Sequence, residues 1–342
     1  MRLLTYTEAL REALAEEMSL DRRVILIGED IGVYGGAFGV TRGLLEKFGH
    51  ERIIETPISE NSFVGMAIGA ALTGLRPVVE IMFMDFITLA MDQIVNQSAK
   101  LRYVLGKQAK CPIVIRTPAG GGRCYGPTHS QTLTAWFVHT PGLKVVAPAT
   151  PADAKILLKS SIRDDNPVVF VEHKLLYPIK GHVPAKIRTV EPLGHAKCLR
   201  KGTDITIIAW SWQTQEALQA VDELALHGIN AELIDLRSLK PIDIETVVES
   251  VKRTHRVLIT GEEPPMAGVA SEIAAQIFEH VFDYLDASIR RLCCPDTPMP
   301  ASPFLEKIAI PDRQKIVHAV LEMMGVSSDG TSERKKGKRK QR

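Results

Sequence analysis

Three segments of the sequence end in residue types that can do chemistry. Glu60 follows an extended, proline-containing run and begins a helical pattern rich in Gly, Ala, Ile and Val. The apolar segment 82–86 follows the next extended run, and His129 lies in a glycine-rich segment after a third. An acid, an apolar wall and an imidazole at three strand ends could together form one pocket for proton transfer.

Each of these residues also has a structural explanation. Ser59 or Asn61 could close the start of the helix, with Glu60 as a first-turn acid favoured by the helix dipole. His129 could be a turn residue held by its two polar neighbours. The apolar side chains of segment 82–86 could simply belong to the core. Taken residue by residue, the sequence leaves both interpretations open.

Several motifs of other enzyme classes are absent from the sequence. It contains no GxxxxGK[ST], GxSxG or HExxH, and no GxGxxG in a helix-opening context. The five cysteines form neither CxxC pairs nor an even disulfide framework, which argues for a reducing compartment and against structural zinc. These cysteines are Cys111, Cys124, Cys198, Cys293 and Cys294.

Short apolar runs alternate with helical patterns of 10 to 20 residues along the chain. This alternation predicts the α/β fold class, with mostly parallel sheets covered on both faces. In parallel sheets, reactive groups belong at the carboxyl ends of the strands. The strands expected in the first half are 23–30, 52–56, 76–83, 111–122, 143–149 and 167–173.

The periodic pattern fades in a polar, proline-containing stretch, which predicts a domain boundary. We expect a first domain at 1–187, a linker at 188–202 and a smaller α/β domain of about four strands at 203–326. Residues 327–342 carry seven of the 42 Lys and Arg residues and predict a disordered basic tail. Weak attraction of this tail to nucleic acid is the alternative.

Composition also bounds the partners and the location of the chain. Without residues 327–342 the chain is mildly acidic, and it has no basic stripe interleaved with aromatic residues, so nucleic-acid binding is not indicated. No apolar run is long enough to cross a bilayer, and no basic leader precedes an apolar signal core. A cytoplasmic protein without membrane partners is therefore expected.

Several stretches together resemble a known family. They occur in the family's order over about residues 3 to 325, and they resemble the beta subunit of the thiamine diphosphate-dependent 2-oxo acid dehydrogenases, the first component of the pyruvate, branched-chain and acetoin complexes. The stretches are "GEDIGVYGGAFGVTRGL", "ETPISENSFVGMAIGAA", "RPVVEIMFMDF", "DQIVNQSAK", "GGGRCYGPTHSQ", "PGLKVVAPATPADAK", "IRDDNPVVFVEHKLLY" and "PDTPMP...LE...IPD".

The resemblance assigns roles to the residues named above. It implies two doubly wound, mostly parallel sheets, the first in a transketolase-like pyrimidine-binding domain and the second in a transketolase C-terminal-like domain. Glu60 matches the glutamate that bonds the aminopyrimidine nitrogen of thiamine diphosphate, and His129 matches the histidine near the reacting carbonyl and the lipoyl group. Met82 and Phe86 match residues that line the pyrimidine. A structural potassium ion is implied at Ile113, Ser161, Ile162, Asp164 and Asn166.

One family motif is missing and implies a partner. Thiamine enzymes hold the diphosphate through Mg²⁺ on a GDG motif, which this sequence lacks. The resemblance therefore implies that an alpha subunit holds Mg²⁺ and completes the cofactor site in an α2β2 heterotetramer. It gives the second domain the roles of pairing two beta chains and docking a dihydrolipoyl acyltransferase core. The segment with Glu262 and Glu263 could lie near that interface or near the mouth of the active site, or the two residues could be solvated loop acids.

The family resemblance leaves several functions to compare. Pyruvate is the expected 2-oxo acid, because "EHKLLY" and "MFMDF" look closer to the pyruvate and acetoin members than to the branched-chain members. The acetoin and branched-chain enzymes are the alternatives, since "PDTPMPASPFLE" departs from the "PMPYA" of many pyruvate members. A single-chain transketolase relative and a non-catalytic scaffold for the acyltransferase are the rivals from other classes.

Overall fold

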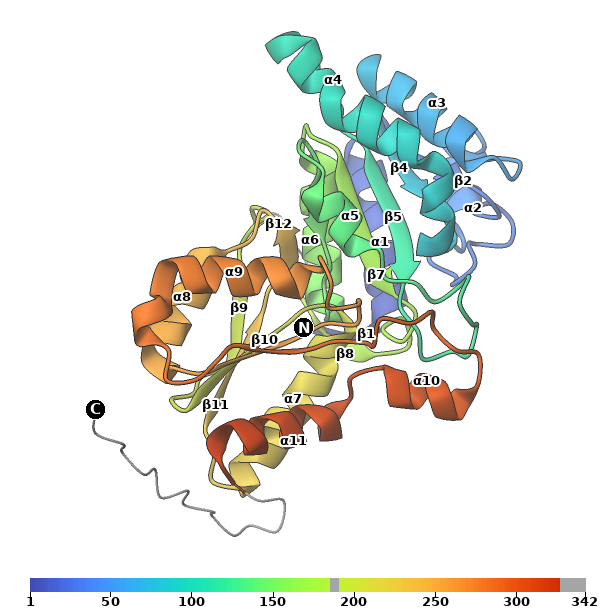
Figure 1. Ribbon diagram of the computed structural model, residues 1–342. Coiled ribbons are helices and arrows are strands. Elements are labelled where there is room, and N and C mark those ends of the chain that lie inside the picture. The colour runs from blue at the N-terminus through green and yellow to red at the C-terminus, as the bar shows by residue number, and fades with distance from the viewer. Residues whose placement is uncertain (185–190, 327–342) are drawn as a thin grey trace, which may run out of the picture.

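The computed structural model describes residues 1–184 and 191–326. The predicted basic tail at 327–342 lies outside the described residues. Two layered α/β units stand side by side, each with a sheet between two sets of helices (Figure 1). The predicted fold class, two mostly parallel sheets covered by helices, is confirmed. In the described residues, no helix is long and apolar enough to cross a membrane.

The first sheet has seven strands in the order β12-β6-β7-β5-β4-β2-β3. All neighbouring pairs are parallel except the edge pair of β12 with β6. The inner strands are almost wholly buried, as continuous apolar runs in parallel sheets require. The strands are β2 (Val24–Gly28), β3 (Ile53–Glu55), β4 (Arg76–Glu80), β5 (Val114–Ala119), β6 (Lys144–Val146), β7 (Val168–His173) and β12 (Ser238–Lys240).

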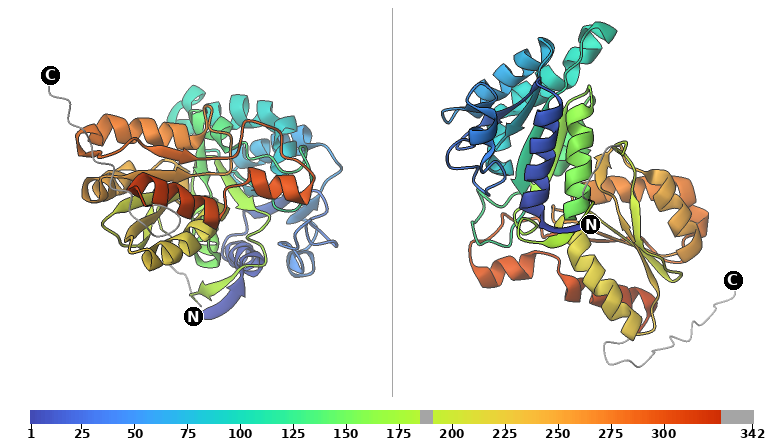
Figure 2. Two further views of the ribbon diagram at one scale, coloured as in Figure 1. Left: turned by 60° about the horizontal axis from the view of Figure 1, so that its bottom comes forward. Right: turned by 180° about the vertical axis from the view of Figure 1, so that it is seen from behind.

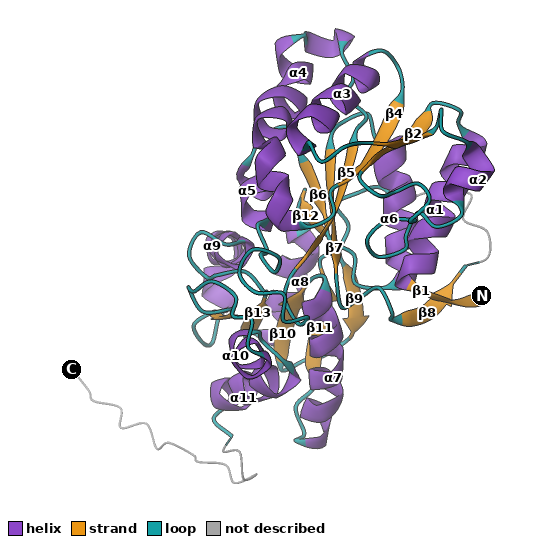
Figure 3. Cartoon of the chain, turned by 90° about the vertical axis from the view of Figure 1, so that its right-hand side faces the viewer, coloured by secondary structure: helices purple, strands orange, loops and turns teal. Residues whose placement is uncertain are grey.

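Helices cover both faces of this sheet. On one face, α1 (Tyr6–Leu20) and α6 (Pro151–Arg163) lie side by side (Figure 2). The sequence starts α1 locally, because Thr5 is the N-cap and forms a capping box with Glu8. The other face is covered by α3 (Glu60–Leu72), α4 (Ala99–Val104) and α5 (Thr134–His139) (Figure 3).

The helix expected after β4 is broken into three pieces. A 3₁₀-helix η1 (Met84–Ala90) leads into a π-helix η2 (Asp92–Ser98) and then into α4. The buried Asp85 explains the first break, because its carboxylate accepts hydrogen bonds from Gln131 in the neighbouring loop. Interruptions of this kind commonly lie next to functional sites. This segment therefore positions the 82–86 wall rather than serving only as cover.

The second sheet has five strands, one more than expected, in the order β14-β13-β10-β11-β9. The extra strand is β9 (Lys197–Arg200), which pairs antiparallel with β11 and occupies part of the segment predicted as linker. The expected linker at 188–202 is therefore wrong over these four residues. The other strands are β10 (Ile205–Ala209), β11 (Ala231–Asp235), β13 (Val257–Thr260) and β14 (Arg290–Leu292).

Helices also cover both faces of the second sheet. On one face lie α8 (Ile244–Thr254) and α9 (Val269–Val281), and on the other α7 (Trp212–Leu226) and α11 (Arg313–Met324) (Figure 1). The helix α10 (Pro303–Ala309) reaches back toward the first unit. This approach brings the side chain of Glu306 on α10 into contact with the loop that follows β5 in the first unit.

The two units are joined by more than a single connection. Strand β12 comes from the second half of the sequence but completes the first sheet, with Ser238 opposite Val146. Just before β12, Arg237 donates to Asp153 at the start of α6 at 3.1 Å. Within the first unit, a two-stranded ribbon of β1 (Arg2–Thr5) and β8 (Lys180–Val183) ties the N-terminus to the end of the first half. The contacts of β12 and Arg237 are the ones that join the two units. These links fix the orientation of the two units.

Candidate active site

Glu60 lies at the first turn of α3, beyond the carboxyl end of β3. Its side chain is only 5% exposed, although the neighbouring Ile58 is 84% exposed. No hydrogen bond to the Glu60 carboxylate forms within residues 1–184 and 191–326. Neither Glu60 oxygen is among the fully buried atoms that lack a partner in the described residues, so the carboxyl end of this side chain reaches the surface. Its position at the rim of the domain suits a group that meets a ligand.

Ordinary helix capping does not explain this carboxyl. Ser59 occupies the N-cap position but makes no capping hydrogen bond with its side chain. Its hydroxyl instead donates to the Pro57 carbonyl at 3.2 Å. The alternative in which Ser59 closes the helix start with its side chain is therefore wrong.

A second carboxyl, Glu29, follows the end of β2 next to Glu60. Burial and the charge of Glu60 raise the pKa of Glu29. One oxygen of Glu29, Oε1, is buried without a hydrogen-bond partner among the described residues. Sequence reasoning missed Glu29, although its place after a buried strand was a usable signal.

The apolar wall after β4 is built around Phe83. Its ring makes edge-to-face contacts with Phe38, Phe86, Tyr125 and His129 at centroid distances between 5.1 and 6.0 Å. Such contacts stabilise a fixed arrangement of the rings. Met82, Phe83 and Phe86 are all half-buried, and Phe83 lies within the predicted segment 82–86.

His129 lies in the loop after β5 and is partly exposed. Its ring contacts Phe83 and Phe86 edge-on, with the Phe86 centroid at 5.2 Å. Thr128 Oγ1 is 3.0 Å from His129 Nδ1, so the predicted contact with a polar neighbour also exists. The structure thus joins His129 to the predicted wall. In the described residues, no hydrogen bond or ring contact links it directly to Glu60.

Lys174 contacts the main chain of His129 and was not predicted as a site residue. Its ammonium group donates to the His129 carbonyl at 2.8 Å and lies 5.4 Å from the centroid of Phe83. The side chain is fully buried. Burial lowers the pKa of Lys174 to about 8. A lysine so close to the wall therefore places a titratable charge beneath the His129 loop.

A buried ion-pair cluster supports the carboxyl edge of the sheet. Arg116 Nε donates to Glu172 at 2.7 Å, and Arg116 Nη1 donates to Glu80 at 2.7 Å. Tyr177 donates its hydroxyl hydrogen to Glu172 at 2.7 Å and stacks on Phe38 with 4.7 Å between the ring centroids. Because Phe38 also contacts Phe83, this cluster connects the interior of the sheet with the wall.

The segments expected to hold potassium gather at the opposite, amino-terminal edge of the sheet. The Arg76 guanidinium donates to the carbonyls of Ile162 and Asp164 at 2.9 and 3.1 Å. The Asp164 carboxylate accepts from the Asn166 side chain at 2.7 Å and from Lys144. The oxygen atoms suit a hard cation, while Arg76 and Lys144 already bring positive charge there.

The remaining predicted residues of this corner are also tied together. The Ile113 carbonyl accepts from the Val168 amide at 2.9 Å, and the Ser161 carbonyl accepts from the Asp164 amide at 3.2 Å. Ser161, Asp164 and Asn166 are thus joined by hydrogen bonds, Ile162 is linked to Asp164 through Arg76, and the Ile113 carbonyl is taken by Val168. In the described part of the chain, no three His, Cys, Asp or Glu side chains cluster in a way that could hold a metal ion.

Glu262 and Glu263 are not solvated loop acids, because both are buried. Glu262 accepts a hydrogen bond from His173 at 2.8 Å, since His173 Nδ1 accepts from the Leu175 amide and its Nε2 carries the hydrogen. Burial alone would raise the pKa of Glu262, but His173, the Gly121 amide and Lys174 more than offset it and lower the pKa. Burial raises the pKa of Glu263 to about 7.

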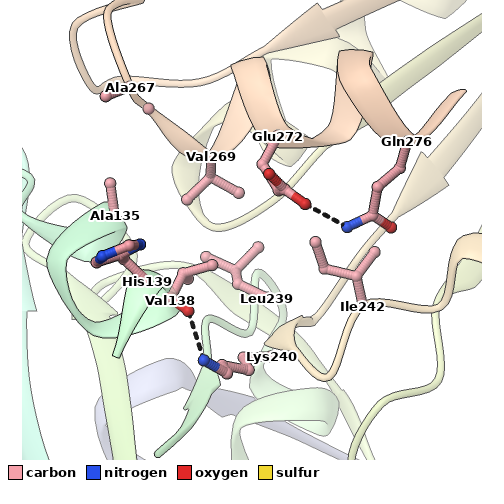
Figure 4. A pocket seen from close by; sticks show the side chains of 11 residues that line it. Ala135, Val138, His139, Leu239, Lys240, Ile242, Ala267, Val269, Glu272 and Gln276 are labelled. Atoms are coloured by element: carbon pink, nitrogen blue, oxygen red, sulfur yellow. Dashed lines mark hydrogen bonds between the residues drawn. The ribbon is translucent and has the colours of Figure 1, made fainter. Parts of the chain in front are cut away.

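Two hollows lie where the units meet. A hollow of about 330 Å³ between the His129 loop and segment 294–299 is bordered by Glu262 and Gln131. Another of about 450 Å³ lies between α5 and α9 (Figure 4). In that hollow, Lys240 donates to the Val138 carbonyl at 2.6 Å and Gln276 donates to Glu272 at 2.6 Å. Lys240, Gln276 and Glu272 therefore already have hydrogen-bond partners within the chain. None of the predicted site residues lines this hollow.

Sequence comparisons give the class of protein that this fold and site define. Residues 2–180 match the family model "Transketolase, pyrimidine binding domain", and residues 194–316 match "Transketolase, C-terminal domain". A solved structure titled "Split gene transketolase, inactive beta4 tetramer" covers 93% of this chain and 97% of its own chain, with a TM-score of 0.77 and 24% identity. That likeness supports the fold.

Curated relatives then give the family. The pyruvate dehydrogenase E1 component subunit beta of Rickettsia felis is 47% identical over 93% of this chain and 97% of its own. That of Gracilaria tenuistipitata var. liui is 49% identical over 92% and 97%. The acetoin:2,6-dichlorophenolindophenol oxidoreductase subunit beta of Cupriavidus necator is 44% identical over 94% and 98%. The chain belongs to the beta-subunit family of the thiamine diphosphate-dependent 2-oxo acid dehydrogenases.

Proposed function

We propose that this chain is the beta subunit of a pyruvate dehydrogenase. With an alpha subunit it would catalyse oxidative decarboxylation of pyruvate and reductive acetylation of the lipoyl group of the acyltransferase. The observation that carries this proposal is the Glu60 carboxyl, which is 5% exposed and has no hydrogen-bond partner in residues 1–184 and 191–326. The names of the relatives support the choice of substrate.

The residues around Glu60 fit one half of thiamine diphosphate. Glu60 would bond a nitrogen of the pyrimidine ring, and Met82 and Phe86 would contact the ring faces. When bound, the cofactor supplies the nucleophilic carbon and takes up the electron pair released with carbon dioxide. Glu29 beside Glu60 raises the cost of placing two negative charges there. Glu60 would exchange a proton with that ring nitrogen.

His129 is proposed to act on the substrate side. Its ring stands edge-on to Phe83 and Phe86, which hold it in one orientation and limit access of water. A positioned imidazole can donate a proton as negative charge develops on a carbonyl oxygen or on a lipoyl sulfur. The aromatic wall thus keeps the proton donor fixed.

The alpha subunit is proposed to close the site and to hold Mg²⁺ with the diphosphate. Glu60 is next to the exposed Ile58, so another surface must cover this rim before water is excluded. Apolar side chains are also exposed at the end of α9, where Phe278 and Phe282, the residue directly after the helix, pair at 4.7 Å between centroids. Exposed apolar groups of this kind support assembly into an α2β2 heterotetramer. Docking of an acyltransferase core and a cytoplasmic location belong to the same proposal.

Reconstitution with the alpha subunit tests the substrate. We expect pyruvate to give a kcat/KM at least about tenfold above 3-methyl-2-oxobutanoate, because one or two extra carbons in an apolar pocket change it by about this factor. The same margin is expected over acetoin, which carries a hydroxyethyl group in place of the carboxylate of pyruvate. Steady-state rates with a lipoyl-domain acceptor measure the difference. A preference for acetoin or the branched-chain acid would select an alternative, and no turnover with any of them would favour the scaffold.

A potassium ion at the Asp164 corner is proposed as a structural element. Ligands that bind only the folded chain raise its stability, so we expect the melting temperature to be a few degrees higher in potassium chloride than in choline chloride at equal ionic strength. Differential scanning fluorimetry of the purified chain measures this without any enzyme assay. Equal melting temperatures in the two salts would rule the ion out.

A further inference from the structure

The loop 119–133 that carries His129 is held by charged side chains from four different elements. Asp85 in η1 accepts from the Gln131 amide at 3.2 Å and from its side chain at 2.9 Å. Lys174 after β7 donates to the His129 carbonyl at 2.8 Å. Asp85 and Lys174 both belong to the first unit. They fix the end of the loop nearest to His129.

The start of the same loop is held by the second unit. Glu262, which follows β13, accepts a hydrogen bond from the Gly121 amide. Glu306 on α10 accepts from the Cys124 amide at 2.9 Å and from the Cys124 thiol at 3.3 Å. Both carboxyls are almost fully buried. Hydrogen bonds from amides to buried carboxylates are stronger than those between neutral groups.

The glycines of the loop show how tightly these carboxyls are seated. A Cβ atom at Gly120 would lie 2.8 Å from Glu262 Oε1 and 1.9 Å from His173 Nε2. A Cβ atom at Gly121 would lie 3.1 Å from Glu306 Oε1. Neither position has room for a larger residue unless its neighbours move. The close approach of the loop to the second unit therefore requires glycine at both positions.

We propose that Glu262 and Glu306 are positioning residues through which the second unit fixes the His129 loop. Neither carboxyl contacts His129, so each acts through the loop backbone. The second unit then helps to position a residue of the active site, although the sequence predicts no catalytic residue in that unit. The inference rests on the proposed role of His129, but the geometry of the loop is independent of that role.

Glu306 offers the sharper test, because one end of its carboxylate bonds the loop and Oε1 has no partner among the described residues. In the full chain assembled with its alpha partner, we expect Glu306→Ala to speed amide hydrogen exchange in residues 119–133 by about tenfold. We expect kcat to fall by about tenfold with KM for the 2-oxo acid within a factor of two. Glu306→Gln retains an acceptor oxygen and should restore most of both.

The matched control is Glu249→Ala, which removes an exposed acid from α8 of the same unit and should change neither readout. Should Glu306→Ala not assemble, Glu306→Asp withdraws the carboxylate by one methylene and tests the same contact. Unchanged exchange in 119–133 for these variants would overturn the proposal. If exchange rises but His129→Ala leaves the rate unaltered, the loop contact stands and the role of His129 is wrong.

Discussion

Replacing Glu60 by Gln is expected to lower 2-oxo acid decarboxylation by the assembled complex about 10²- to 10⁴-fold, the range of general acid–base catalysis. The amide keeps the size of the side chain but cannot exchange a proton with a ring nitrogen. Because the carboxyl is buried beside Glu29, removing its charge also relieves repulsion. The fold should therefore be retained, and thermal stability should be equal or higher.

The matched control for this variant is Glu55→Gln, which changes an exposed acid at the end of β3. It should retain wild-type rates, because its side chain lies in solvent. Decarboxylation measured with an artificial electron acceptor separates this step from transfer to the lipoyl group. A Glu60→Gln complex that decarboxylates at the wild-type rate would rule out the catalytic assignment of Glu60.

Arg116→Ala is expected to cost about 3 to 5 kcal/mol of unfolding free energy, the usual effect of removing one partner from a buried ion pair. The guanidinium is 2% exposed and bonds Glu172 and Glu80. Without it, both carboxyls lose their positive partner in the interior. Burial already raises the pKa of Glu172, although Arg116 and Tyr177 counteract it. Urea unfolding followed by tryptophan fluorescence measures the loss.

A surface pair provides the comparison for this variant. Arg290 pairs with Glu322, and both side chains are well exposed. Arg290→Ala should leave the urea midpoint close to that of the wild type, because exposed ion pairs contribute little. Adding Glu172→Gln to Arg116→Ala should recover part of the loss, since one unpaired charge disappears. Equal midpoints for Arg116→Ala and Arg290→Ala would contradict a structural role for the buried cluster.

Local patterns in the sequence predict much of the fold and fail where distant segments decide. The helix at 6–20 is predictable because Thr5 and Glu8 form a local capping box. Strands β9 and β12 are only four and three residues long, so neither shows a period. Both exist because another strand offers hydrogen bonds to them. The 3₁₀ and π segments after β4 similarly depend on Gln131, 46 residues away from Asp85.

The site divides in the same way. Glu60 and His129 follow recognisable strands, and their place at the carboxyl edge is what a parallel sheet requires. The family resemblance then assigned their roles. Lys174 was not predicted, and the contact of Glu262 with the loop 119–133 could not be, because burial of a charged side chain depends on distant contacts that no local pattern encodes. The sequence could not decide whether Phe83 is a wall or a core residue, because both kinds of position take the same apolar residue types.

Strand β12 comes from the second half of the sequence but belongs to the first sheet, and this limits how the protein could be recombined with its relatives. A chimera that swaps everything after the predicted linker would also replace residues 238–240, and with them the edge of the first sheet. Unless the incoming strand paired with Val146 in the same register, β6 would become an exposed edge strand, which is prone to pairing with other molecules. The two halves therefore cannot be exchanged independently. Recombination between paralogues should favour crossover points that leave β6 and β12 from the same parent.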